Sequence, residues 1–379
     1  KELYNFFIND EEYREKTEKL VSVISTKDNE RISKAMAEEL YGKTLMLSAS
    51  KLEKYNACAF SYFLNYGLIA QEREKAGIEP RSTGTIQHAA LCEFFSEIEK
   101  SKTPYENITK EDCYNRINEI VKNEAIKSTE LLYEASSYYK YVVTRMQGIA
   151  ARTAWEVVKF YRSSTFRPVG FEITIATGGE IPAITVTDEK GEGIAQIRGI
   201  IDRADSAVVD GKTYISIVDY KSSQKKLEAR LAEAGVHIQP LLYADIISKR
   251  MNASPAAMLY MQMTDPIVEE SKLKNMEDSL EKTISQNIHL GGWLVDNESV
   301  VSAYSRGGEN GEKFLPGGKS DMISEKELRD RIDAANIKIH EAAMGIKSGF
   351  FPIKPYTDKG FDPCSYCIYD KICEQRLEL

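Results

Sequence analysis

Apolar residues recur with a helical period over the first part of the chain. In the run LSASKLEKYNACAFSYFLNYGL the apolar and aromatic positions follow Ser48 and Ser50, either of which can cap a helix. A second helix is predicted over 84–100, with five apolar residues on one side: Ile86, Ala89, Ala90, Phe94 and Ile98. Residues 110–163 contain no Pro and few Gly and predict a long helical region, and 1–45 predict a charged helical lead-in.

The pattern changes after this region. PVGFEITIA, GIAQIRGIIDRADSAVVDG and TYISIVDYKSS are short β-rich runs separated by Gly and Asp turns. A helix over 237–250, a strand over 256–263 and a helix over 324–348 follow, whereas 265–322 are mixed and contain no assignable motif. The simplest arrangement is one α/β domain in which helices before and after a small sheet cover it.

Composition excludes several classes of protein. The chain has 379 residues, 42% of them hydrophobic, and no apolar run of the roughly 18–20 residues that a membrane span needs. A net charge of −8 argues against a general nucleic-acid coating protein but not against an enzyme with a local basic groove. No signal peptide is visible and six cysteines are too few for a disulfide scaffold, so we expect a cytoplasmic protein. The chain begins with Lys, which indicates a piece of a longer protein.

The strongest chemical signal is a strand end. Asp219 and Lys221 stand two residues apart at the end of a buried strand and therefore point to the same face. A carboxylate that holds a divalent cation beside a lysine suits metal-assisted phosphodiester hydrolysis. We expect Asp202 to end the preceding strand and to supply a second carboxylate. An isolated D-x-K is more commonly a surface ion pair, and that alternative stays open at this point.

Three further features extend this site. Gln239 and Tyr243 lie at i and i+4 on one helix face and can hydrogen-bond a phosphate, although a helical Tyr is more often part of a core. His88 in GTIQH can add a nitrogen ligand, although a lone helical His is more often structural. Glu172 is a further candidate residue for this site, although its side chain can equally point to solvent.

These pieces, in the order GTIQH, FEI, GIIDRAD, VDYKSS and QPLLY, resemble the RecB-type branch of the PD-(D/E)xK nuclease superfamily. The resemblance implies a restriction-endonuclease-like α/β core with a small central mixed sheet flanked by helices. It implies that Mg2+ or Mn2+ is held by His88, Asp202, Asp219 and the main-chain carbonyl of Tyr220. It also implies that Lys221 is the catalytic lysine and that Gln239 and Tyr243 are a pair that faces DNA.

Three cysteines close the chain in FDPCSYCIYDKICE, with the spacing C-x2-C-x5-C, which suits a four-ligand site that lacks one member. Members of this branch carry an iron–sulfur cluster held by one cysteine before the core and three after it. The resemblance therefore implies a [4Fe–4S] cluster on Cys58, Cys364, Cys367 and Cys373 that joins the two ends of the chain. Cys92 and Cys113 are competitors for the upstream position. Zinc, disulfides and unconnected thiols remain alternatives from the residues alone.

Within the branch, LSASKLEKYNACAFSYFLNYGL and the cysteine segment resemble the nuclease domain of AddB subunits of bacterial AddAB helicase–nucleases. The resemblance divides the chain into a lead-in at 1–45 and a nuclease domain at 46–379. It implies an exonuclease that degrades the 5′-terminated strand of DNA during double-strand break repair and recombination, together with an AddA-type partner and without a membrane. The alternatives are a non-catalytic DNA-binding scaffold and a free-standing exonuclease like those of CRISPR adaptation.

Basic residues follow the predicted active strand. Lys225, Lys226 and Arg230 come shortly after Lys221 and can contact DNA phosphates on either single strands or an unwound duplex end. The same residues are also compatible with a solvated helix face. The sequence therefore predicts a local DNA path next to the candidate site.

Overall fold

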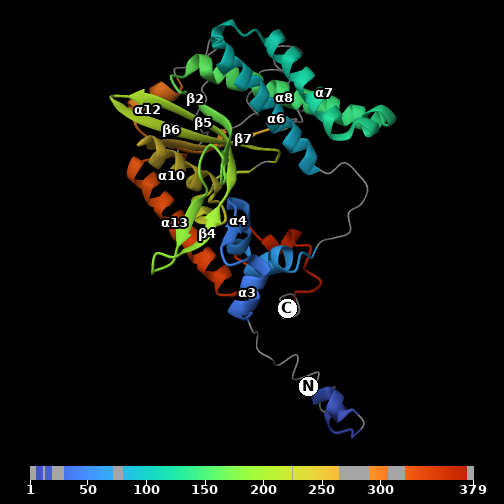
Figure 1. The fold of residues 1–379 in the computed structure, drawn as a ribbon. Coiled ribbons are helices and arrows are strands. Elements are labelled where there is room, and N and C mark those ends of the chain that lie inside the picture. Colours follow the sequence, from blue (N-terminus) through green and yellow to red (C-terminus); the bar gives the residue numbers. More distant parts are fainter. Residues whose placement is uncertain are drawn as a thin grey trace.

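A six-stranded mixed sheet lies at the centre of the computed structural model, between two layers of helices (Figure 1). The structure describes residues 6–11, 13–18, 30–70, 80–223, 225–263, 290–305 and 321–373. The strand order is β2-β5-β6-β7-β8-β9. The strands span Arg167–Ile175, Gly199–Val209, Lys212–Lys221, Ser254–Gln262, Leu290–Val295 and Met322–Ile323 in that order. This mixed central sheet confirms the fold that the family resemblance implies.

Strand β6 is the centre of this sheet. It pairs antiparallel with β5 and parallel with β7, so neighbours cover both of its edges. Ile215, Ile217 and Val218 are fully buried, because helices cover both faces. The strand that carries Asp219 is therefore paired along both edges and buried on both faces.

One face of the sheet is covered by α6 (Pro80–Ser101) and α8 (Ser137–Ser163), and α7 (Lys110–Ala135) packs on these two helices (Figure 1). The helical region predicted over 110–163 is confirmed, and it consists of two helices that break at Ser136. The Ser136 hydroxyl accepts a hydrogen bond from the Tyr139 amide at 3.2 Å and so caps α8.

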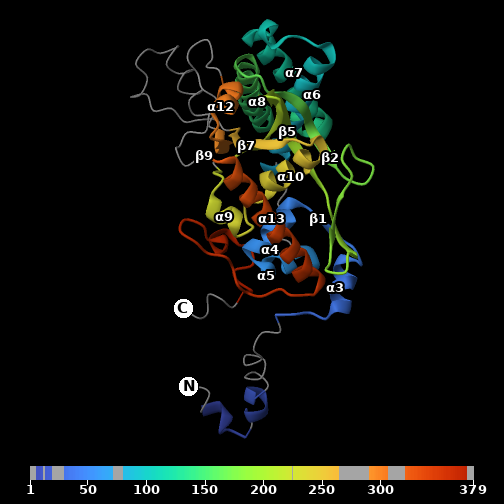
Figure 2. The ribbon, with the colours of Figure 1, turned by 90° about the vertical axis from the view of Figure 1, so that its left-hand side faces the viewer.

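The opposite face is covered by α4 (Ala49–Ala57), α10 (Gln239–Met251) and α13 (Glu325–Lys347) (Figure 2). The helices predicted over 237–250 and 324–348 are thus confirmed to within two residues. Of the two candidate caps for α4, Ser48 takes that role, since its hydroxyl accepts from the Lys51 amide at 3.3 Å. This layer lies next to the end of β6 that carries Asp219 and Lys221.

A small second sheet joins the start of the chain to this layer. It has the order β1-β4-β3, in which β1 (Leu45–Leu47) runs parallel to β4 (Gly193–Ile197) and β3 (Ile184–Thr187) runs antiparallel to it. The expected lead-in is helical at 6–8, at 14–18 and in α3 (Lys34–Tyr41). The boundary between 1–45 and 46–379 stays a prediction.

The structure describes part of residues 265–322, the region in which the sequence shows no assignable motif. Residues 290–305 form β8, which extends the sheet, and α12 (Glu298–Tyr304), which packs on the same face of the sheet as α8. The loop SRGGENGEKFLPGGKSD lies almost wholly outside the described residues. Among the described helices, none combines the length and the apolar character that crossing a membrane requires.

The segment that follows α13 packs against an early part of the chain. After α13 the chain reaches α4, α5 (Ala59–Tyr62) and the π-helical turn Phe63–Gly67 (Figure 2). The Tyr356 amide donates to the Ala57 carbonyl at 2.8 Å, and the Tyr369 hydroxyl donates to Asn65 at 3.1 Å. Segments at opposite ends of the sequence therefore form one structural unit.

A buried ion pair lies between β5 and α8. Arg203 and Asp205 are 1% and 0% exposed, and Arg203 Nε lies 3.0 Å from Asp205 Oδ2. The Tyr161 hydroxyl donates to Asp205 Oδ1 at 2.6 Å, and the Arg203 guanidinium lies over the Phe160 and Tyr161 rings. The pair can be buried because each charge has a partner.

We expect Asp205→Ala to lower the free energy of unfolding by about 3–5 kcal/mol, since it leaves the buried Arg203 charge without its partner. Urea denaturation measures this loss. The control is Lys338→Ala, which removes an exposed pair with Glu341 and should cost at most about 1 kcal/mol. A loss for Asp205→Ala no larger than that of the control would contradict the prediction.

Candidate active site

The end of β6 carries two charged side chains that meet, as the strand alternation predicts. Lys221 Nζ lies 2.5 Å from Asp219 Oδ2. Asp219 is 2% exposed, and the Lys221 side chain is 22% exposed. The pair is therefore not a surface ion pair, because the carboxylate is buried and only the lysine reaches solvent.

Asp202 lies next to this pair, but not where the sequence interpretation placed it. We expected Asp202 to end its strand, whereas it lies near the start of β5. Strands β5 and β6 are antiparallel and pair Arg203 with Val218, so the start of β5 meets the end of β6 and Asp202 comes beside Asp219. The Tyr220 amide donates to Asp202 Oδ2 at 2.7 Å, which fixes the carboxylate.

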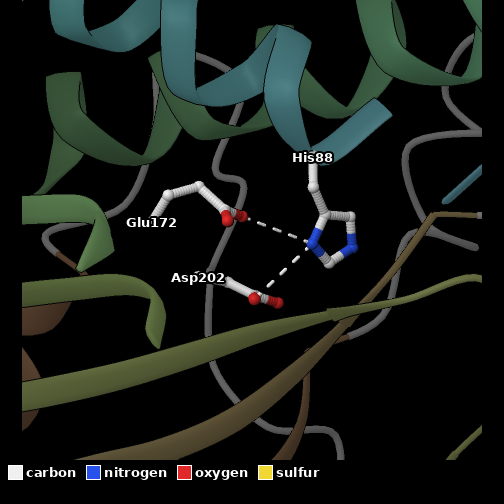
Figure 3. Close-up of side chains that lie close together, drawn as sticks. All are labelled: His88, Glu172 and Asp202. Carbon is white, nitrogen blue, oxygen red and sulfur yellow. Dashed lines mark ion pairs between the residues drawn. The ribbon is translucent and has the colours of Figure 1, made fainter. Parts of the chain in front are cut away.

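His88 and Glu172 complete a cluster with Asp202. His88 Nδ1 lies 3.5 Å from Glu172 Oε1 and 3.5 Å from Asp202 Oδ1 (Figure 3). The ligand atoms of the three residues lie within 4.8 Å of one another. The imidazole comes from α6, and the carboxylates come from β2 and β5. Three elements that are far apart in the sequence thus converge on one point.

Glu172 adopts an unusual backbone conformation. Its φ is +49°, a value that is uncommon for any residue other than glycine. It lies between the paired residues Phe171–Arg203 and Ile173–Ile201, which places it opposite Asp202. The open choice between solvent and site is therefore decided by the fold, since the carboxylate points at His88 (Figure 3).

The carboxylates perturb one another and the imidazole. Burial, and then the nearby charge of Asp202, raise the pKa of Asp219 to about 7 against the opposing effect of Lys221. Burial lowers the pKa of His88, but hydrogen bonds to Asp202 and Glu172 outweigh it and raise that pKa to about 10. The two carboxylates that face the imidazole, together with Asp219 beside Asp202, therefore concentrate negative charge at one point.

The donor set fits a divalent metal ion. Carboxylate oxygens with one imidazole suit Mg2+ or Mn2+, and Oδ2 of Asp219 is buried against the Lys221 ammonium. The cluster contains two predicted ligands, His88 and Asp202, and adds Glu172. Asp219 lies beside Asp202 and pairs with Lys221, and its role as a ligand stays a prediction, as does that of the Tyr220 carbonyl.

Gln239 and Tyr243 reach the site from α10. The Lys221 ammonium donates to Gln239 Oε1 at 3.2 Å, and Gln239 and Tyr243 hydrogen-bond each other. Tyr243 is 3% exposed, and a Cβ at Gly199 would come within 2.7 Å of its hydroxyl. Tyr243 is therefore buried where α10 packs on the sheet, as a helical Tyr more often is, and its predicted contact with DNA stays a prediction.

Glu53 belongs to the site, although the sequence reasoning missed it. Its Oε1 accepts hydrogen bonds from the amides of Ile238 at 2.9 Å and Gln239 at 3.0 Å. A signal was available, since GVHIQP contains no Ser, Thr, Asp or Asn that could cap the following helix. Only the fold shows which distant residue supplies the cap.

The three predicted DNA-binding cations differ in their surroundings. Arg230 lies 2.7 Å from Glu228 and 2.7 Å from Asp358, so two carboxylates match its charge. Lys225 Nζ lies 3.9 Å from Glu53. Lys226 is 62% exposed, with Asp321 at 3.9 Å, and is the most accessible of the three. They lie in a loop and in the short helix α9 (Ala229–Glu233) rather than along one solvated helix face.

The four predicted cluster cysteines line one pocket of about 520 Å3. Cys58 lies between α4 and α5, and Cys364, Cys367 and Cys373 lie on the returning C-terminal segment. The competitors lie elsewhere, because Cys113 is fully buried in the helical layer and Cys92 Sγ lies 3.8 Å from the Phe171 carbonyl. The four cysteines therefore line the same pocket, and their shared binding of a metal centre stays a prediction.

Comparisons with known proteins agree with this geometry. Residues 46–374 match the sequence profile of the PD-(D/E)XK nuclease superfamily. Three curated relatives, from Clostridium novyi, Caldanaerobacter subterraneus and Clostridium acetobutylicum, are each named as a subunit of an ATP-dependent helicase/deoxyribonuclease. Each is 29% identical over 98% of this chain, and the aligned part is 34%, 33% and 33% of the relative. The chain therefore spans about a third of the length of these relatives.

Proposed function

Because this chain belongs to the PD-(D/E)XK nuclease superfamily, we propose that it is a divalent-metal-dependent DNA nuclease that hydrolyses phosphodiester bonds. One observation carries the proposal: His88, Glu172 and Asp202 bring their ligand atoms within 4.8 Å of one another beside the Asp219–Lys221 strand end. A scaffold without catalysis has no need to bury carboxylates together, because their mutual repulsion destabilises the fold.

The residues divide into ligands and residues that act on the substrate. His88, Glu172, Asp202 and Asp219 would hold Mg2+ or Mn2+, which when bound supplies positive charge and Lewis acidity beside the scissile phosphate. Lys221 supplies an ammonium group next to these ligands. It extends from the buried pair toward solvent, where it can orient an attacking water or stabilise charge that develops on the phosphate.

Gln239 and Tyr243 position this lysine. Gln239 accepts from the Lys221 ammonium, and the buried Tyr243 hydroxyl holds the Gln239 amide. A flexible lysine side chain is thereby restricted to one orientation, which is what a preorganised site requires. Lys226, and to a smaller extent Lys225, would contact the phosphates of the DNA next to the site.

We include a [4Fe–4S] cluster on Cys58, Cys364, Cys367 and Cys373. Their shared pocket supports it. Burial raises the pKa of the Cys58 and Cys364 thiols in the metal-free chain, so binding of the cluster would supply the positive charge that holds them as thiolates. Its role would be to hold the two ends of the chain around the nuclease core.

The larger assembly follows from the relatives. Their names combine an ATP-dependent helicase with a deoxyribonuclease, so we propose that this chain is the nuclease domain of an AddB-type protein. Its partner would be an AddA-type helicase–nuclease, and its substrate a single-stranded or unwound DNA end in double-strand break repair, within the cytoplasm. Alignment over nearly the whole chain favours this over a free-standing exonuclease of the CRISPR-adaptation type.

The test is cleavage of end-labelled single-stranded DNA by this chain. We expect product with Mg2+ or Mn2+, loss of product to background in EDTA, and recovery when the metal is returned in excess, because the carboxylate cluster needs a cation to approach a phosphate. Cleavage that persists in EDTA, or no cleavage with either metal, would contradict the proposal.

A further inference from the structure

The N-terminus of α10, which begins at Gln239, has no capping side chain from its own segment. The residue before the helix is Ile238, whose side chain cannot accept a hydrogen bond, and the helix begins at Gln239. The first amides of a helix have no intrahelical partner, and a buried amide without an acceptor is unfavourable. The sequence around α10 therefore leaves the position of Gln239 to be fixed from elsewhere.

We propose that Glu53 is a positioning residue of the active site: its carboxylate caps α10 from the neighbouring helix α4 and thereby fixes Gln239, which holds Lys221. One oxygen of Glu53, Oε1, accepts from the amides of both Ile238 and Gln239, at 2.9 and 3.0 Å. The inference rests on the proposed function, whose catalytic lysine it concerns.

The surroundings of Glu53 support this role. Its side chain is 14% exposed, so water competes little for the two amides. A negative charge at the N-terminus of a helix is stabilised by the helix dipole, and hydrogen bonds to a carboxylate are stronger than those to a neutral oxygen. Oε2 lies 3.9 Å from Lys225, which orients the carboxylate from its other side.

A short chain of contacts leads from Glu53 to the reacting strand. The Glu53 carboxylate holds the Gln239 amide, the Gln239 side chain accepts from Lys221 at 3.2 Å, and Lys221 lies 2.5 Å from Asp219. Glu53 itself lies on α4, which ends where Cys58 begins the cysteine pocket. Helix α4 therefore connects the cysteine pocket mechanically to the catalytic lysine.

The experiment compares Glu53→Ala and Glu53→Gln with the parent chain. Glu53→Ala removes the acceptor, and we expect the rate constant of single-turnover cleavage to fall on the order of 10- to 100-fold at an unchanged Kd for DNA. Glu53→Gln keeps an oxygen at the same place and should restore most of the rate. Hydrogen exchange of the Ile238 and Gln239 amides should accelerate in Glu53→Ala and much less in Glu53→Gln.

The matched control is Ser136→Ala. It removes the cap of α8, which packs on the face of the sheet opposite to α10 and therefore lies away from Gln239. This variant should lose comparable stability and keep the parent cleavage rate.

Four results would overturn the inference. They are unchanged cleavage and amide exchange in Glu53→Ala, an equal loss of rate in Ser136→Ala, a failure of Glu53→Gln to restore the rate, and weaker DNA binding as the sole defect. Amide exchange does not depend on activity. If the parent chain fails to cleave DNA, the proposed function fails, while the exchange data still decide whether Glu53 caps α10.

Discussion

Replacing Asp219 by asparagine is expected to abolish cleavage and, in metal-free protein above pH 7, to stabilise the fold. Cleavage should fall by at least about 10²–10³-fold, because the substitution removes a buried negative charge from a site that depends on electrostatic preorganisation. The side chain keeps its size, so the strand end keeps its packing. Activity and stability should therefore change in opposite directions.

The sign of the stability change follows from the pKa of Asp219. Burial and the charge of Asp202 raise this pKa from 3.8 to about 7 in the folded chain. Between these two values the folded state retains a proton that the unfolded state releases, so the parent loses stability as the pH rises from about 4 to 7. The loss amounts to at most about 4 kcal/mol. Asparagine does not titrate, so the variant lacks this loss.

Denaturation in EDTA at pH 5 and pH 8 measures the effect. From pH 5 to pH 8 the parent should lose more free energy of unfolding than Asp219→Asn loses. The control Asp330→Asn, on the exposed side of α13, should lose as much as the parent. A variant that cleaves DNA at the parent rate, or whose stability falls with pH as steeply as that of the parent, would show that Asp219 is not the buried, functional carboxylate described above.

The second large effect is expected at the cysteine pocket. Cys367→Ser removes one of the four ligands of the proposed cluster, whose cysteines come from distant parts of the sequence. Closing a loop around the whole core costs on the order of 5 kcal/mol, and a structural metal site contributes on the order of 10 kcal/mol. Losing that contribution should lower Tm by on the order of 20 °C.

Iron, zinc and acid-labile sulfide in the purified protein decide what the centre is. The parent should contain iron and sulfide without zinc, and Cys367→Ser should have lost most of both. Cys92→Ser is the matched control, since Cys92 lies outside the pocket, and its metal content and Tm should stay close to those of the parent. A Cys367→Ser protein with full metal content and an unchanged Tm would refute the proposed cluster.

Much of this architecture could be predicted from local pattern. The buried strand that ends in Asp219 and Lys221 follows from its apolar run, and helices α10 and α13 follow from their period. These predictions succeed because tertiary burial acts in the same direction as the local hydrophobic pattern.

The errors and omissions arise where one element meets another. The antiparallel register, which no local pattern encodes, places Asp202 near the start of its strand rather than at its end. The positive φ of Glu172 turns its carboxylate into the site, and the packing of α10 buries Tyr243. The Glu53 cap likewise depends on two helices that only the tertiary fold brings together.

The most direct test of the proposed active site is a single comparison of cleavage. End-labelled single-stranded DNA is incubated with Mn2+ and either the parent chain or Asp219→Asn, purified side by side and at equal folded concentration. We expect labelled product from the parent and none above background from the variant. Equal product from both would place the hydrolysis outside the β6 strand end and contradict the proposed site.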